Sequence, residues 1–500
     1  MLESVRIGSR GTPSTLVLGL FKGQKLDAAS AKLDPSGAAK GACSRAEASG
    51  DLGSCVQAFP GSPSKGGYDR VVVIGLGDAD AFEPGMLRQV GAAFGRVAAG
   101  AKLTGAQIAL DGALGSLKRS IDEEACGNAF GEGLGLVAWN YDHLRGTATT
   151  LPERPKVTVF TDDRDFKAGL KRGLGLAESA NIARDLSQTP PNIAHTDYIA
   201  KEAMALARKF EHLKCTVIKG ERLEKEKMLG LINVGKASDH APCLIRLEWA
   251  PPNAKKTDKP IVLVGKTMTY DSGGLSIKVG GGMRGMKRDK DGGCAVFGAM
   301  HAVASTIKPK RRVVALLSVA ENSISDEAYR PDDVIEFRNG VTVEVTNTDA
   351  EGRLVMADAL CWACDKEKPA CLIDMATLTG GVVVALGKVY AGMWCDDDAL
   401  RGKLDAAADA SGERVWRLPH HSEYKSMMKS PIADILNSAP VREAHPIQGA
   451  AFLAHFVKEG IPWAHIDIAG THATDKDAGP FIAGPTGFGT RLLAELIDAF

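Results

Sequence analysis

The segment PIVLVGKTMTYDSGG, residues 260–274, decides the fold, because a continuous apolar run ends there in charged and small residues. A strand that is apolar on both faces is typical of a parallel sheet buried between helices. In open α/β sheets, ligands bind at the carboxyl ends of such strands. The segment therefore predicts a buried parallel sheet with a binding site at its edge.

Further apolar runs in the second half of the chain follow the same pattern. They are CLIRLEW (243–249), RRVVALLSVAEN (311–322), ACLIDMATLTG (370–380) and WAHIDIAG (463–470). Several of them also end in polar clusters at their carboxyl sides. Together they predict a central, largely parallel sheet that is covered by helices on both faces.

The first part of the chain alternates strand-like and helical stretches, which predicts a separate α/β domain. A long helical pattern then runs to SQTPPN (187–192), where two prolines end it. The chain is thus predicted to fold as an α/β protein with two domains joined by a helix. We place the N-terminal domain at 1–165, the linking helix at 166–192 and the larger domain at 193–500.

Charge and composition exclude several classes of protein. The 500 residues carry 61 basic and 61 acidic side chains, so the chain as a whole does not attract nucleic acid or an anionic membrane. No run approaches the roughly 18 apolar residues of a membrane span, and the N-terminus lacks a signal-peptide pattern. We expect a cytoplasmic protein without a membrane partner, with its 10 cysteines reduced.

Two short motifs resemble a phosphate-binding loop and half of a zinc site. The GKT at 265–267 follows an apolar strand, but a phosphate-binding loop needs a second glycine where this chain has Pro260. Cys361 and Cys364 have the spacing of half a zinc site, but they lie on a predicted helix and have no second such pair. We interpret them as two helix thiols without chemistry.

Four acidic residues are predicted to converge at the sheet edge from three strand-end loops: Asp271, Asp289, Asp349 and Glu351. Converging carboxylates repel one another strongly unless cations lie among them. Such a set can hold two divalent ions roughly 3.5–4 Å apart, which activate a water and stabilise an oxyanion. The alternative is that these acids only cap helices or pair with lysine and arginine. Glycines at 273–274 and 280–282 favour the metal site, because they let the backbone approach a ligand closely.

The stretch NTDAEGRL (347–354) resembles the signature of the leucyl aminopeptidase, or cytosol aminopeptidase, family. Other stretches that resemble the family in order and spacing are 183–192, 264–278, 286–289, 321–334, 374–380 and 465–470. The similarity is good over roughly 165–500 and weak before it. It implies that 193–500 is the catalytic domain of a metal-dependent enzyme that removes N-terminal amino acids from peptides.

The resemblance implies two metal sites. Lys266, Asp271, Asp289 and Glu351 would bind one ion, and Asp271, Asp349 and Glu351 would bind the other. Lys266 can ligate only as a neutral amine, so it must lose its proton far below the ordinary lysine pKa of about 10.4. Two dications and burial both favour that loss. Zinc or manganese would suit these ligands, and cobalt or magnesium would also be accepted.

The same resemblance gives catalytic roles to two basic residues. Lys278 would keep its proton and stabilise the oxyanion of the scissile carbonyl. Arg353 would hold a bicarbonate ion as general base, which suits its planar, bidentate guanidinium. The pocket for the substrate side chain, leucine or another large apolar group, would be lined by Met286, Thr377, Gly380 and Ala469.

The chain departs from the family pattern at three places, which leaves the side-chain preference open. Lys290 and Asp291 stand where relatives usually have an apolar and a small residue, and we interpret Asp291 as a helix start rather than a ligand. The segment 442–453 replaces a more glycine-rich one, and His472 follows DIAGT. None of the histidines occupies a ligand position of the family, and we treat them as structural.

The resemblance also implies partners. We expect peptide substrates and a homohexamer with the N-terminal domain on the outside. An alternative function is DNA binding, because some bacterial members of the family act as accessory proteins in recombination or transcription. The balanced charge argues against nucleic acid, although a local basic patch is compatible with a neutral total.

Overall fold

The computed structural model describes residues 1–9, 11–61, 67–255 and 257–500. These residues form two compact units, one of 1–181 with 474–483 and one of 182–473 with 484–500. The division falls inside α6 (Arg164–Gln188), which overlaps the predicted linking helix at 166–192. Nothing in the sequence indicated that residues 474–483 belong to the first unit.

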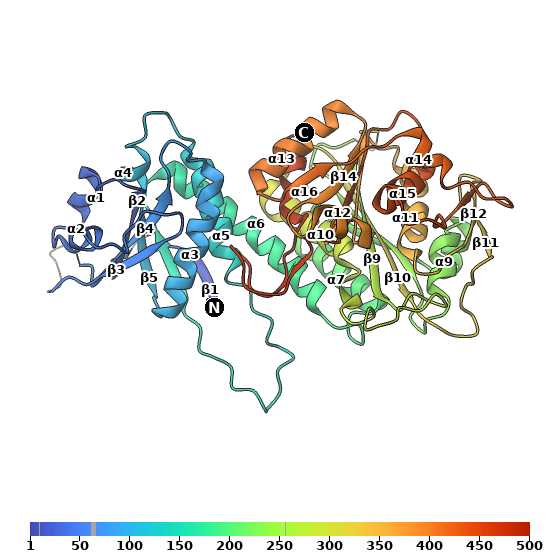
Figure 1. Cartoon of the computed structure of the whole chain (residues 1–500), viewed down its shortest axis with the longest axis horizontal. Helices are drawn as coiled ribbons and strands as arrows, with labels where there is room; N and C mark the ends of the chain where they lie inside the picture. Colours follow the sequence, from blue (N-terminus) through green and yellow to red (C-terminus); the bar gives the residue numbers. More distant parts are fainter. Residues whose placement is uncertain (10, 62–66, 256) are drawn as a thin grey trace. The chain divides into compact units, whose positions relative to one another are not determined.

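The first unit is built on a six-stranded sheet (Figure 1). Its strands, in spatial order, are β1 (Ser4–Ile7), β6 (Lys156–Phe160), β5 (Gly105–Ala109), β2 (Thr15–Phe21), β4 (Arg70–Gly77) and β3 (Cys55–Ala58). All neighbours are parallel except β3 and β4. The helices α3 (Leu87–Gly100) and α5 (Glu123–Leu136) share a core with one face, and α2 (Ala38–Cys43) packs on the other. Short helices α1 (Ala28–Leu33) and α4 (Asp111–Leu114) complete the unit.

Glycines allow α3 and α5 to pack closely. A Cβ added to Gly133 of α5 would lie 1.8 Å from the backbone oxygen of Arg88 in α3. We expect Gly133→Ala to destabilise the first unit by about 2 kcal/mol, because backbone atoms yield less than a flexible side chain. Gly100→Ala at the end of α3 is the matched control, since a Cβ there meets nothing within 4 Å. Hydrogen exchange of the α3 and α5 amides would measure the stability of the first unit in both variants. Equal protection of these amides in the two variants would contradict the prediction.

The second unit is built on an eight-stranded sheet with a parallel centre. Its strands, in spatial order, are β15 (Val415–Arg417), β14 (Ala391–Cys395), β17 (Trp463–Asp467), β13 (Cys371–Ala376), β9 (Ile261–Asp271), β10 (Val313–Asn322), β8 (Cys243–Trp249) and β7 (Leu213–Lys219). The four strands from β17 to β10 are parallel, which confirms the predicted sheet. β8 is an exception, because it runs antiparallel to both β10 and β7. The described residues of the connection from β8 to β9, 250–255 and 257–260, contain no helix, and a parallel crossover needs a longer connection.

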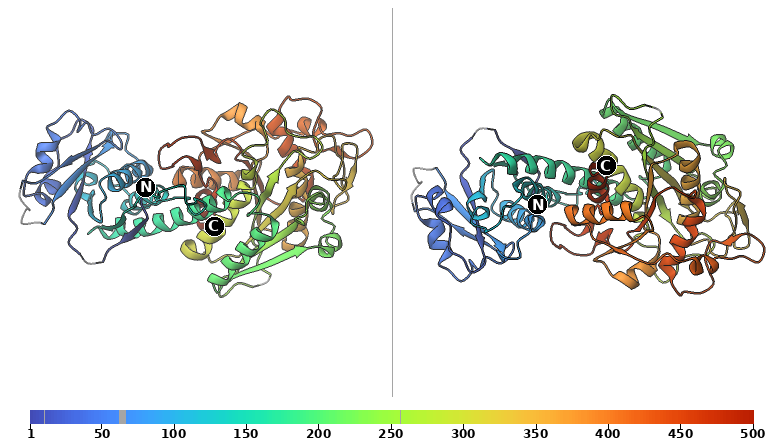
Figure 2. Two further views of the ribbon diagram at one scale, coloured as in Figure 1. Left: turned by 90° about the horizontal axis from the view of Figure 1, so that it is seen from below. Right: turned by 90° about the horizontal axis from the view of Figure 1, so that it is seen from above.

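Helices cover both faces of this sheet (Figures 1 and 2). One face shares a core with α7 (Thr196–Lys209), α10 (Asp291–Ala302), α13 (Asp398–Ser411) and α16 (Thr490–Asp498). The other shares a core with α9 (Leu229–Gly235), α11 (Glu351–Trp362) and α15 (His445–Leu453). Along β9, Leu263 belongs to the first core, whereas Val262 and Val264 belong to the second. Burial on both faces therefore explains the continuous apolar run at 261–264.

The cysteines form no disulfide. Cys361 lies in α11 and Cys364 in the π-turn that follows it, and both are buried. Burial raises the pKa of the Cys361 thiol, which disfavours the reactive thiolate. In the described part of the chain, no helix combines the length and the apolar character that a membrane span requires.

Candidate metal centre

β9 carries two predicted site residues to the carboxyl edge of the sheet. Lys266 lies within the strand and Asp271 is its last residue, and both are buried. Pairing with β10 continues past a bulge as far as Asp271 opposite Asn322. Asp271 thus stands on the strand itself, whereas the sequence predicted it in the loop that follows.

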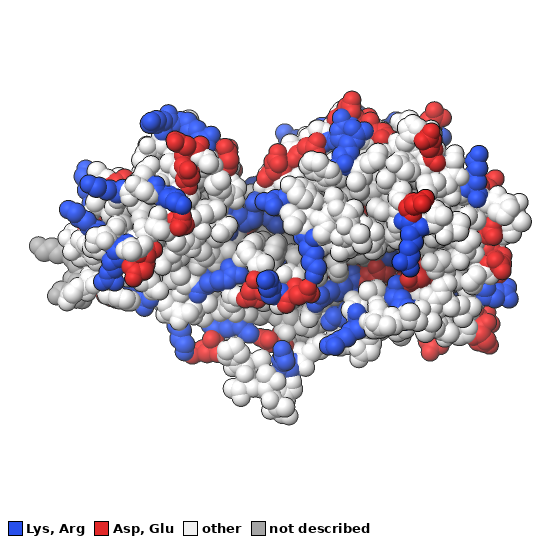
Figure 3. Space-filling view, in the orientation of Figure 1, with Lys and Arg blue, Asp and Glu red and all other residues white. Residues whose placement is uncertain are grey.

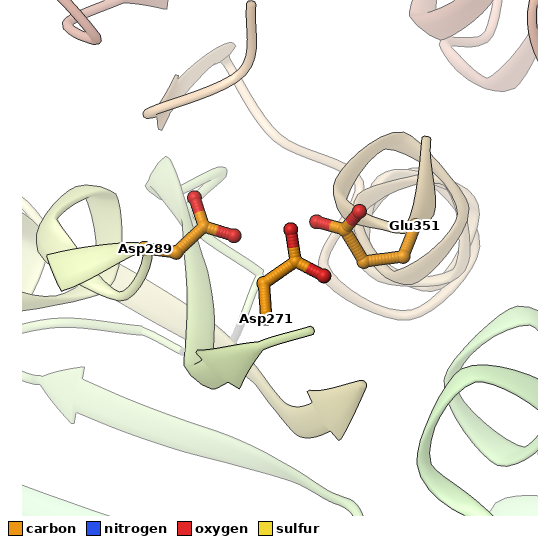
Figure 4. Close-up of side chains that lie close together, drawn as sticks. All are labelled: Asp271, Asp289 and Glu351. Atoms are coloured by element: carbon orange, nitrogen blue, oxygen red, sulfur yellow. The ribbon is translucent and has the colours of Figure 1, made fainter. Parts of the chain in front are cut away.

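Two further acids approach Asp271 from the starts of two helices. Asp289 lies just before α10, and Glu351 is the first residue of α11. One carboxylate oxygen from each of Asp271, Asp289 and Glu351 lies within 4.8 Å of the other two (Figure 4). Because all three side chains are buried, their mutual repulsion is weakly screened and needs positive charge nearby.

Two lysines supply positive charge from the protein itself. Lys266 Nζ lies 2.8 Å from Asp289 Oδ1 and 2.9 Å from Glu351 Oε1. Lys278 Nζ lies 2.8 Å from Asp271 Oδ2. Burial would lower the pKa of each lysine, but the surrounding carboxylates outweigh it and raise the pKa above its ordinary value. The protein's own charges therefore favour the ammonium form of both.

Asp349 lies at the rim of this cluster. It follows β12 (Thr342–Glu344) in the loop before α11, and its side chain is 32% exposed. It is outside the group of three close carboxylates but pairs with Lys278, which it shares with Asp271. Burial, followed by repulsion from Asp271, raises the pKa of Asp349 to about 6.

Neighbouring polar groups orient the buried acids. Asn322 Nδ2 donates to Asp271 Oδ1 at 2.8 Å, and the backbone N–H of Gly273 donates to the same oxygen at 2.9 Å. Thr377 Oγ1 donates to Asp289 Oδ1 at 2.8 Å. Asn322 is missing from the predicted site. Its position at the end of the strand beside β9 was the signal that could have identified it.

Arg353 lies on α11, two residues after Glu351, and is buried. Its Nη1 donates to the backbone oxygen of Asn437 at 2.8 Å, and its Cζ lies 6.0 Å from the ring centre of Phe452. Its buried Nε has no hydrogen-bond partner among the described residues. Burial lowers the pKa of Arg353 to about 10, so the guanidinium is still charged at neutral pH. A buried cation with an unused donor suits an anionic ligand.

All the predicted site residues line one pocket of about 420 Å³. Its wall contains the predicted metal and catalytic residues Lys266, Asp271, Lys278, Asp289, Asp349, Glu351 and Arg353. It also contains the four predicted substrate contacts, Met286, Thr377, Gly380 and Ala469. Arg288, His445 and His472 line the same pocket and were not predicted there, since the histidines were treated as structural.

The residues that depart from the family pattern lie at different places in the structure. Asp291 begins α10, as predicted, and its Oδ2 lies 2.7 Å from His472 Nδ1. Lys290 is buried, and its Nζ donates to the backbone oxygens of Ser187 and Thr189 at 3.1 Å each. Asp291 thus contacts a residue of the pocket wall, whereas Lys290 contacts the C-terminal end of α6 and the residue that follows it.

The donor set fits divalent cations. In addition to the three close carboxylates, Asp289 Oδ2 is buried and has no hydrogen-bond partner in the described part of the chain. An ion pair with lysine leaves this oxygen unused, whereas a cation would occupy it. Carboxylate oxygens are ligands for magnesium, manganese and zinc alike.

Comparison with known proteins gives the family. Residues 181–494 match the catalytic domain of the cytosol aminopeptidase family, and residues 17–147 match the N-terminal domain of the same family. The chain belongs to the cytosol aminopeptidase family. This confirms the resemblance of the catalytic motifs and extends it to the N-terminal part, where those motifs are weak.

Relatives from two bacteria are similar over most of their length. A probable cytosol aminopeptidase of Desulfovibrio desulfuricans is 38% identical over 436 residues, which cover 85% of this chain and 85% of the relative. One of Geobacter sulfurreducens is 39% identical over 435 residues, which cover 86% of this chain and 85% of the relative.

Two solved structures share the fold. The bottromycin maturation enzyme BotP in complex with Mn has a TM-score of 0.84 and 30% identity, with 97% of this chain and 99% of that chain covered. A tomato leucine aminopeptidase mutant has a TM-score of 0.85 and 29% identity, with 99% and 96% covered. Family membership makes this chain a metal-dependent aminopeptidase, and the predicted enzyme class is confirmed.

Proposed function

We propose that this enzyme uses two divalent ions to remove N-terminal amino acids from peptides, with leucine and other large apolar residues among its substrates. The convergence of three buried carboxylates within 4.8 Å carries the proposal. Two lysines beside them support it, as do the 420 Å³ pocket and the Asp289 oxygen that forms no hydrogen bond with a described residue.

We assign one ion to Lys266, Asp271, Asp289 and Glu351, and the second to Asp271, Asp349 and Glu351. Two cations would relieve the repulsion among the acids and favour the neutral amine that Lys266 needs as a ligand. When bound, they would supply an activated water and an anchor for the α-amine of the substrate. Zinc and manganese suit these donors, and cobalt or magnesium would also be accepted. Manganese is the ion bound to BotP.

The chain's own basic residues have separate roles in this proposal. Lys278 would donate to the scissile carbonyl oxygen as negative charge develops there, because its Nζ lies in the pocket wall and keeps its proton. Arg353 would hold a bicarbonate ion, which would serve as the base. The buried, unpartnered Nε and the persistent charge of Arg353 support that assignment.

Peptides are the proposed partners, and DNA binding gains no support. Basic and acidic side chains are interspersed on the face shown in Figure 3, and the relatives are named as aminopeptidases. A homohexamer and a cytoplasmic location are proposed from the family resemblance alone. A single-chain mass in light scattering would contradict the hexamer.

Metal removal tests the proposed function. We expect chelation to lower the release of p-nitroaniline from leucine p-nitroanilide more than about tenfold, and single divalent ions to restore it. The order of restoration would rank the metals. A circular dichroism spectrum of the stripped protein controls for unfolding. If no ion restored turnover on leucine or on a panel of other aminoacyl p-nitroanilides, the proposed function would be wrong.

A further inference from the structure

Two departures from the family pattern meet in one hydrogen-bonded pair. Asp291 and His472 are separated by 181 positions in the sequence, yet Asp291 Oδ2 lies 2.7 Å from His472 Nδ1. Asp291 begins α10, and His472 follows β17 in the segment that also carries Ala469. The pair therefore links the start of α10 to the segment that follows β17.

The two members of the pair differ in exposure. The side chain of Asp291 is 6% exposed, whereas that of His472 is 24% exposed and lines the pocket beside Met286 and Ala469. Asp291 does not line the pocket. The carboxylate is thus placed behind the imidazole, and only the imidazole is available to a ligand.

The carboxylate determines which ring nitrogen carries the proton. A carboxylate oxygen is an acceptor, so His472 Nδ1 donates its hydrogen to Asp291 and the neutral ring keeps a lone pair on Nε2. Asp291 is the one hydrogen-bond partner of this ring among the described residues, and its contact is to Nδ1 and not to Nε2. A charged partner on one edge of the ring also makes the other nitrogen a better acceptor.

We propose that His472, held by Asp291, is a specificity-determining residue that accepts a hydrogen bond from the side chain of the N-terminal residue. This inference rests on the proposed function and deepens it, because it adds side chains with a hydrogen-bond donor to the apolar ones. Arg288 in the same wall disfavours lysine and arginine side chains, and ionised acidic side chains have no donor to offer. The favoured class is therefore uncharged and donor-bearing, such as asparagine, glutamine, serine or threonine.

Leucine and asparagine test this inference, because their side chains have nearly the same shape and differ in the donor. We would measure kcat/KM for asparagine and leucine p-nitroanilides and take the ratio of the two. His472→Met is expected to lower that ratio about tenfold or more, because the donor would lose its acceptor in the pocket. His472→Gln should retain most of the ratio, since its amide oxygen can accept the same hydrogen bond.

A second histidine–carboxylate pair provides the matched control. His420 Nδ1 lies 2.8 Å from Asp396 Oδ2, and neither residue lines the pocket. His420→Met should therefore leave the ratio unchanged. An unchanged ratio in His472→Met would overturn the inference, whether or not the overall rate fell. Failure of the wild-type protein to hydrolyse any aminoacyl substrate would instead refute the proposed function.

Discussion

Glu351→Gln is expected to lower turnover of leucine p-nitroanilide about 1000-fold or more, which corresponds to ~4 kcal/mol of transition-state stabilisation. Glu351 is the first residue of α11, and its Oε1 lies 2.9 Å from Lys266 Nζ. In the proposed site it would be a ligand of both ions. A neutral amide keeps the size of the side chain but removes the charge that would bridge them. Kinetics combined with metal analysis would show a parallel loss of activity and bound metal.

The control for Glu351→Gln is a buried glutamate outside the pocket. Glu367 accepts from Arg246 Nε at 2.6 Å, and its side chain is only 7% exposed. Glu367→Gln removes the same charge from a similar ion pair and should leave turnover within about twofold, as for most sites without a catalytic role. Both variants should keep the circular dichroism spectrum of the wild type. Full activity of Glu351→Gln would refute its assignment as a ligand.

The centre of the fold could be predicted because burial on both faces leaves a direct mark on the sequence. The run at 261–264 is continuously apolar, and in the structure its residues alternate between two cores. The same signal cannot distinguish a parallel strand from a buried antiparallel one. That is why the run at 243–249, which becomes β8, gave no indication of its antiparallel pairing.

The candidate site was predictable to the extent that its residues follow strands or begin helices. Asp271 is the last residue of β9, and Glu351 meets it because α11, which Glu351 begins, packs against the same sheet. The pairing of Asp291 with His472 was not predictable, because it depends on side-chain packing between distant segments. Local patterns do not encode that packing, so the sequence indicated only a helix start at Asp291 and a structural histidine at His472.

Lys278→Met is expected to lower kcat about 100- to 1000-fold with a smaller change in KM, the signature of an interaction made mainly in the transition state. Methionine has a similar length but cannot donate to an oxyanion. Lys278 also pairs with Asp271 and Asp349, so its loss could act through the metals instead. Equal metal content in the wild type and the variant would separate these two causes.

Lys287→Met is the matched control for the loss of an ammonium group close to the site. Lys287 Nζ donates to the backbone oxygen of Gln188 at 2.8 Å, and the residue does not line the pocket. Its replacement should therefore leave kcat within about twofold, because a partly exposed hydrogen bond away from the reacting atoms contributes mainly to stability. Lys278→Arg should recover part of the rate, since it restores a charged donor with different geometry. If Lys278→Met kept kcat within tenfold at full metal content, oxyanion stabilisation would have to come from other groups, and the role proposed for Lys278 would be wrong.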